Sequence, residues 1–134
     1  MSLFGAIGVS GSGIGAAQTW IDTIAGNLAN ANDAVATSQG AYAQQTPVFT
    51  PTGAPGSVGQ GVAVSSVQLG STIGQIAYQP KSPLADANGN VRLPAVDVAG
   101  QLLGLVAAQN AYQANTVAMN RANQAYQAAL TLGS

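Results

Sequence analysis

The sequence of 134 residues contains no cysteine and no histidine. Without cysteine there can be no disulfide bond, thiolate catalysis or sulfur-ligated metal, and without histidine the commonest metal ligand and general base is missing. The acidic residues are four scattered aspartates, Asp22, Asp33, Asp86 and Asp97, with no glutamate. Turns and helix caps explain Asp86 and Asp97 better than acid–base chemistry does. We therefore expect no catalytic residue, no metal, no cofactor and no small-molecule substrate.

Charge of either sign is scarce. Charged residues make up 5% of the sequence, against about 25% in a typical domain. The formal net charge of −1 gives little repulsion between copies, which favours association. A secreted globular protein of low charge would fit this composition. A structural subunit that neighbouring chains bury on most sides fits it better.

The few cations also limit the possible partners. Lys81, Arg92 and Arg121 are the only basic residues, so no basic patch can neutralise phosphates or anionic lipid headgroups. We expect no nucleic-acid partner. The best apolar run, Val98 to Ala108, is far shorter than the ~20 residues that span a bilayer. Met1 to Val9 has no positively charged start, so no cleavable secretory signal is expected.

Apolar residues recur every seven positions in the N-terminal third. The two sets are Ile7, Ile14, Ile21 and Leu28, and Leu3, Ala17, Ile24 and Ala31. A spacing of seven predicts a helix that packs against a partner with left-handed supercoiling. Early glycines lower helix propensity, so the helix is predicted chiefly from Ile14 to Leu28, with a start that frays outside an assembly.

The C-terminal third has the same period. Its main stripe is Val98, Leu105, Tyr112, Met119 and Tyr126, and its predicted neighbouring stripe is Leu102, Gln109, Thr116, Asn123 and Leu130. Asp97 can cap the helix N-terminus, because its carboxylate can accept hydrogen bonds from the first turn. The helix should run to about Leu130, and Gly133 is a plausible stop.

Between the helices the helical period is lost, and all six prolines lie there. Gly61–Leu69 alternates as a strand does, with a bulge between Val64 and Val67. Further strands are predicted at 73–78 and 91–93, joined by a turn at Asn88-Gly89. Residues 46–61 are predicted to be a loop. The chain is thus α+β, with a helix in 1–31, an extended loop and small antiparallel β-domain in 32–95, and a helix in 96–134.

Three asparagines lie together at the end of the first predicted helix, Asn27, Asn30 and Asn32. Asparagine suits a helix terminus, where its side chain can bond the nearby backbone. The alternative is that Asn27 and Asn30 bond adjacent subunits, because a buried amide without partners costs about 1 to 3 kcal/mol.

The run Ile24–Ala31 resembles the N-terminal signature of the bacterial flagellar axial proteins, the family of rod, hook and hook-associated subunits. Three more blocks, 78–89, 93–98 and 111–115, together with the chain length and the ending 130–134, resemble its proximal rod members. The resemblance covers essentially the whole chain in order.

The resemblance implies a structural subunit of the proximal rod of the flagellar basal body, which polymerises in the axial structure that transmits motor torque. It implies export without a cleaved signal peptide and a coiled coil of the terminal helices inside a β-rich layer. The implied partners are proximal and distal rod subunits, with the rod adaptor and the MS-ring protein at the base, in a helical homo- or hetero-oligomer. The expected interface and signature residues are Ile7, Ile14, Ile21, Ile24, Asn27, Leu28, Asn30, Val98, Leu105, Tyr112, Asn115, Met119 and Tyr126.

The chain also departs from this family. Members usually carry a basic residue soon after the tyrosine that matches Tyr42, where this chain has Ala43-Gln44-Gln45. Hydrogen bonds from amides and alanine packing would then replace salt bridges. A rival interpretation is a secreted, alanine-rich helical interaction protein. Such a protein would need a hairpin turn after Trp20, and the sequence has none there.

Overall fold

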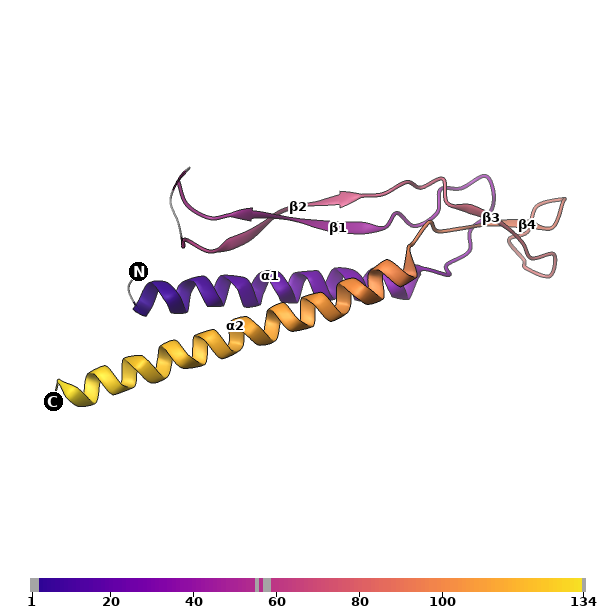
Figure 1. The fold of residues 1–134 in the computed structure, drawn as a ribbon. Coiled ribbons are helices and arrows are strands. Elements are labelled where there is room, and N and C mark those ends of the chain that lie inside the picture. Colours follow the sequence, from indigo (N-terminus) through magenta and orange to yellow (C-terminus); the bar gives the residue numbers. More distant parts are fainter. Residues whose placement is uncertain (1–2, 55, 57–58, 134) are drawn as a thin grey trace. The chain divides into compact units, whose positions relative to one another are not determined.

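The computed structural model describes residues 3–54, 56 and 59–133, so Met1, Ser2 and Ser134 of the predicted terminal helices lie outside the described residues. The fold is α+β, as predicted (Figure 1). The elements in order are α1 (Leu3–Asn30), β1 (Gln45–Pro51), β2 (Val62–Leu69), β3 (Gln75–Tyr78), β4 (Asn90–Leu93) and α2 (Val98–Leu132). Neither described helix has the length and apolar character needed to cross a bilayer.

The chain forms two compact units, and each unit takes residues from both helices and from the middle. The first comprises Met1–Ile21, Pro47–Ser66 and Leu105–Ser134, and the second comprises Asp22–Thr46 and Val67–Gly104. The predicted boundaries at residues 31 and 95 stay a prediction.

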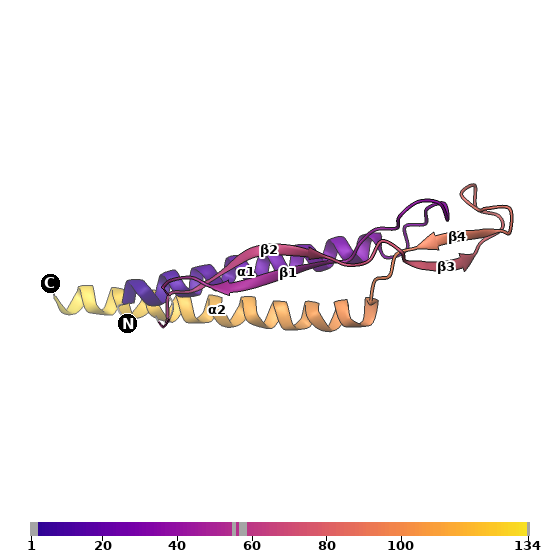
Figure 2. The same ribbon diagram turned by 90° about the horizontal axis from the view of Figure 1, so that it is seen from above.

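In the first unit, α1 and α2 run antiparallel side by side (Figures 1 and 2). Small side chains let the two helices approach closely, and Ala16, Ala17 and Ala108 are all buried. The helix α1 begins at Leu3 in spite of its early glycines. Fraying of this start outside an assembly stays a prediction.

The helix α2 begins where the sequence predicts. The Gly100 N–H donates to Asp97 Oδ1 at 3.0 Å, which confirms Asp97 as the N-cap. The helix continues to Leu132, slightly beyond the predicted end near Leu130.

The strands form two separate two-stranded sheets, β1 with β2 and β3 with β4. The strand β1 occupies 45–51, so the predicted loop is wrong for residues 46–51. Residues 52–54, 56 and 59–61 belong to no helix or strand, and residues 55, 57 and 58 of the predicted loop lie outside the described residues. Pro47 and Pro51 obscured β1, because proline is usually a strand breaker. Each strand here has only one neighbour, however, and proline is tolerated on a free edge where no N–H is needed.

Hydrogen bonds just outside the two ends of the β1–β2 pair show that its strands are unequal. The Thr52 N–H donates to the Gly61 carbonyl at 3.0 Å, and the Gly70 N–H donates to the Gln44 carbonyl at 2.8 Å. Eight residue steps separate Gln44 from Thr52, whereas nine separate Gly61 from Gly70. The segment containing β2 therefore holds one extra residue, as a bulge requires.

In the second unit, β3 and β4 pair antiparallel, with Ala77 opposite Val91. Val91 is fully buried and Pro94 is also buried, so the core of this unit lies beside β4. Val35 forms an isolated antiparallel bridge with Arg92, which ties the segment after α1 to the outer side of β4.

Candidate functional site

Asn27 is the centre of a hydrogen-bonded junction in the second unit. Its side chain is 0% exposed. Its Nδ2 donates to the Gln45 carbonyl at 2.7 Å and to Gln101 Oε1 at 2.8 Å. Its Oδ1 accepts from the Tyr42 hydroxyl at 3.0 Å and from the Gln45 N–H at 2.8 Å. One amide thus joins α1, the segment before β1, the first residue of β1 and the first turn of α2.

This junction changes the interpretation of the asparagine cluster. Asn27 has two N–H donors and two acceptor positions, and the chain itself occupies all four. No group of this amide is left for an adjacent subunit, so that alternative is wrong for Asn27. Asn30 makes a local bond from its Nδ2 to the Gly26 carbonyl at 2.7 Å, as expected at a helix end.

Two glutamines complete the junction. Gln45 bonds Asn27 through its backbone, and the Gln44 side chain accepts a hydrogen bond from the Asp97 N–H at 3.1 Å through its Oε1. These glutamines stand where the resembling family usually has a basic residue. Amide hydrogen bonds do occur at this position, but they lie within the chain.

A second tie in this unit joins the turn of the β3–β4 hairpin to the segment after α1. Asp86 Oδ1 accepts from the Asn88 and Asn90 N–H groups, both at 2.9 Å, and Asp86 Oδ2 accepts from the Thr37 hydroxyl at 3.2 Å. The hydrogen bond from the Asn90 N–H is the largest cause that lowers the pKa of Asp86 below its usual value. The Arg92 guanidinium donates to the Thr37 carbonyl at 2.7 Å and to the Ile73 carbonyl.

The helix–helix contact of the first unit pairs predicted residues on α2 with residues on α1. A Cβ added to Gly13 would lie 2.6 Å from Asn115 Cγ, and one added to Gly11 would lie 3.4 Å from Met119 Cε. Nearer the end of α2, Tyr126 packs edge-on against Phe4, with ring centroids 5.2 Å apart. The sequence analysis did not single out Phe4, because it lies outside the heptad sets.

The predicted heptad residues differ in how far the chain covers them. Those that are half-buried are Ile7, Ile14, Ile21, Leu28, Leu105, Tyr112, Met119 and Tyr126, whereas Ile24 is buried. Val98, at the start of α2, is exposed. Their assignment to a subunit interface stays a prediction.

The chain itself leaves most of the neighbouring stripe predicted on α2 uncovered, although Thr116 is half-buried. Leu102, Gln109, Asn123 and Leu130 are exposed. The inward residues instead fall three positions after the main stripe, at Ala108, Asn115 and Ala122. Small side chains occupy this inner stripe because the helices approach closely there, and the leucines are left outside.

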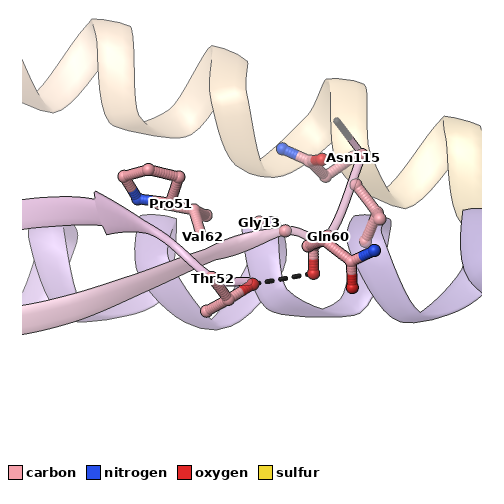
Figure 3. Close-up of a pocket in the computed structure, with 9 residues that line it drawn as sticks. Gly13, Pro51, Thr52, Gln60, Val62 and Asn115 are labelled. Carbon is pink, nitrogen blue, oxygen red and sulfur yellow. Dashed lines mark hydrogen bonds between the residues drawn. The ribbon is translucent and has the colours of Figure 1, made fainter. Parts of the chain in front are cut away.

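A cleft lies between the two helices and the end of the β1–β2 pair, within the first unit (Figure 3). Its volume is about 330 Å³, and its lining includes Gly13, Thr52, Gln60 and Asn115. The Thr52 hydroxyl donates to the Gln60 carbonyl at 2.7 Å. Its described lining residues carry amide and hydroxyl groups and no ionisable side chain.

Ser12 holds the β1–β2 pair against α1 near this cleft. Its hydroxyl donates to the Val9 carbonyl at 2.7 Å and accepts from the Val62 N–H at 3.1 Å. A Cβ on Gly61 would meet the Ser12 side chain, so glycine is required there. On the same side of α1, Trp20 packs edge-on against Phe49 with ring centroids 5.8 Å apart.

The outward face of α2 exposes many apolar side chains among neutral polar ones. Leu103 is 74% exposed, and further exposed large residues on this helix are Val98, Leu102, Val106, Val117, Leu130 and Leu132. Arg121 is the only charged residue from Val98 to Leu132. A helix whose outer face meets water normally carries charged and polar residues there. Among residues 3–54, 56 and 59–133, no group of acidic side chains could hold a metal ion.

Comparison with known proteins finds relatives for nearly the whole chain. The family model described as flagellar basal body rod FlgEFG protein C-terminal matches residues 87–132. The flagellar basal-body rod protein FlgC of Salmonella typhimurium is 35% identical over 133 residues, which cover 99% of each chain. The proteins of the same name from Borreliella burgdorferi and Bacillus subtilis are each 28% identical over 149 residues, with 98% and 99% of each chain covered.

Proposed function

Because the chain belongs to the family of flagellar basal-body rod proteins FlgC, we propose that it is a structural subunit of the proximal rod. It polymerises in the axial structure and transmits motor torque. The observation that carries this proposal is the set of large apolar side chains exposed on α2, a helix whose only charge is Arg121. Exposed apolar surface of this kind marks sites where other protein binds.

The partners follow from the family resemblance. They are other rod subunits on the proximal and distal sides, with the rod adaptor and the MS-ring protein at the base. The chain reaches them by export without a cleaved signal peptide. Contacts between different surfaces of successive subunits propagate as a helix, which is the geometry of a rod.

The proposed function is mechanical. The cleft beside Asn115 has no ionisable side chain, and the carboxylate of Asp86 caps a turn. The half-buried heptad residues on α1 and α2 gain their remaining cover from neighbouring subunits, so that folding is completed on assembly. The rival function, a secreted helical interaction protein, is not favoured by the family of the relatives.

The proposal can be tested on the outer face of α2. Leu103→Glu places a charge in the uncovered apolar face, whereas Gln109→Glu adds the same charge at an exposed polar position of the same helix. We expect Leu103→Glu to abolish incorporation into purified basal bodies and swimming motility, while Gln109→Glu retains both. Both variants should melt like the parent as isolated chains. Normal incorporation of Leu103→Glu would refute burial of this face, and absence of the unaltered chain from basal bodies would refute the proposed function itself.

A further inference from the structure

The β3–β4 hairpin has two edges, and the chain itself covers the edge of β4. Arg92 exchanges two backbone hydrogen bonds with Val35, each 2.9 Å long. The Asn90 N–H donates to Asp86 Oδ1 at 2.9 Å, and the Asn90 carbonyl accepts from the Asp86 N–H at 2.9 Å. Every outward backbone group of Asn90 and Arg92 therefore has a partner.

The edge of β3 is different. The Gln79 N–H donates to the Gly89 carbonyl, so Gln79 and, by alternation, Ala77 and Gln75 direct their backbone groups toward β4. Ile76 and Tyr78 consequently direct theirs away from it. In the described part of the chain these outward groups have no recorded partner. The side chains of Ile76 and Tyr78 are 57% and 73% exposed.

Native proteins usually protect a free strand edge with charge, proline or a covering segment. The strand β1 follows this rule. The Thr52 N–H points toward β2, so Pro51 and Pro47 present their nitrogens on the outer edge, where they have no hydrogen to donate. The strand β3 has no proline and no charge, and no described segment covers its edge. An unprotected, apolar edge can pair with a strand from another chain.

The partner strand should share these properties, because a charged or proline-rich segment would not pair with this edge. The strand β2 is the longest in the chain, carries neither charge nor proline, and pairs only with β1. Its second half, from Ser65 to Leu69, is exposed. We propose that the free edge of β3 in one copy receives β2 of the next copy.

This contact joins two different surfaces, so it is repeated from copy to copy without closing into a dimer. It rests on the proposed function, since it names one contact through which rod subunits of this kind join. A two-fold contact between identical strands would stop after two copies and could not extend a rod.

Engineered disulfides test the contact without a competing thiol, because the natural chain has no cysteine. Ile76→Cys is combined with Val67→Cys in one variant and with Gln68→Cys in a second, so that both alternating positions of β2 are sampled. A disulfide forms only when the two Cα atoms lie about 4.4 to 6.8 Å apart. Basal bodies from cells that carry one variant as their only copy are oxidised. We expect a ladder of covalent multimers from one of the two pairs.

The matched control replaces Ile76→Cys by Ile73→Cys, because Ile73 is 72% exposed but lies outside β3. It should give no ladder. Intact basal bodies that contain the chain but yield only monomers from both test pairs would overturn the contact and leave the proposed function standing. Basal bodies without even the unaltered chain would instead overturn the proposed function.

A second pair of variants covers the case in which the cysteine chains do not assemble. Ile76→Lys places a charge on the free edge of β3, and Ile73→Lys places the same charge beside it. We expect Ile76→Lys to lower incorporation at least tenfold and Ile73→Lys to lower it less than twofold. Equal incorporation of the two lysine variants would overturn the proposed contact.

Discussion

Asn27 shows how one buried side chain can fix the relation of distant segments. Its amide bonds Gln45 and Gln101, and it accepts from Tyr42. A leucine or alanine would leave several buried groups without partners, whereas Asn30 holds only a local helical bond. The sequence analysis identified the asparagine cluster correctly as a helix end. It could not identify the partners of Asn27, because those partners are set by tertiary contacts.

We expect Asn27→Ala to lower the free energy of unfolding by roughly 2 to 4 kcal/mol, since it leaves the Gln45 N–H, the Tyr42 hydroxyl and the Gln101 side chain unmatched. Asn30→Ala should cost less than about 1 kcal/mol, because it removes one local bond. Urea unfolding followed by circular dichroism measures both changes. Equal losses in the two variants would contradict the central role of Asn27.

The turn at Asp86 should weaken in acid. The pKa of Asp86 is lowered in the folded chain, chiefly by the hydrogen bond from the Asn90 N–H. The ionised carboxylate therefore stabilises the fold above its unfolded pKa, near 3.8, and this contribution is lost as the pH falls through the lower folded pKa. Amide exchange at Asn88 and Asn90 should rise in that range. Asp86→Asn should show faster exchange already at neutral pH and little further change in acid.

The helices and strands differ in how well the sequence predicts them. The heptad spacing and the Asp97 cap predicted both helices, and turn residues predicted β3 and β4, because these patterns act over a few residues. The strand β1 was missed because it contains two prolines, which usually break a strand but here face its free outer edge. The stripe of α2 that faces α1, which includes Ala108, was not predicted, because the sequence alone does not show how closely two helices approach.

Glycines on α1 give a matched test of that close approach. A Cβ on Gly13 would collide with Asn115, whereas nothing lies within 4 Å of a Cβ on Gly15. Gly15→Ala should stabilise the chain by about 0.5 to 1 kcal/mol through helix propensity alone. Gly13→Ala should lose this gain and destabilise the chain, and adding Asn115→Ala should recover part of the loss. Thermal unfolding of the four variants distinguishes the two sites, and a stabilised Gly13→Ala chain would contradict the packing.

Considered as a whole, the molecule lacks charge where an independent protein would have it. The chain of 134 residues has only three basic residues and four aspartates. Of these, Asp86, Arg92 and Asp97 already form hydrogen bonds within the chain. Contacts with other subunits must therefore rely on apolar surface and backbone or amide hydrogen bonds.

Assembly should accordingly be insensitive to screening of charge. Raising sodium chloride from about 0.05 to 0.5 M shortens the Debye length from roughly 14 to 4 Å and weakens contacts between exposed ions. We expect the chain to remain in purified basal bodies at both concentrations, as quantified by immunoblotting after sedimentation. Selective release of this subunit at high salt would show that ion pairs hold it.

The bond between Asn27 and Gln101 spans 74 positions of the sequence. A chain that arrives with its N-terminus first cannot make this bond until most of its length has followed. In a chain delivered in this order, the first helix could be fixed to the last only late, so the polypeptide would become rigid only near the end of delivery.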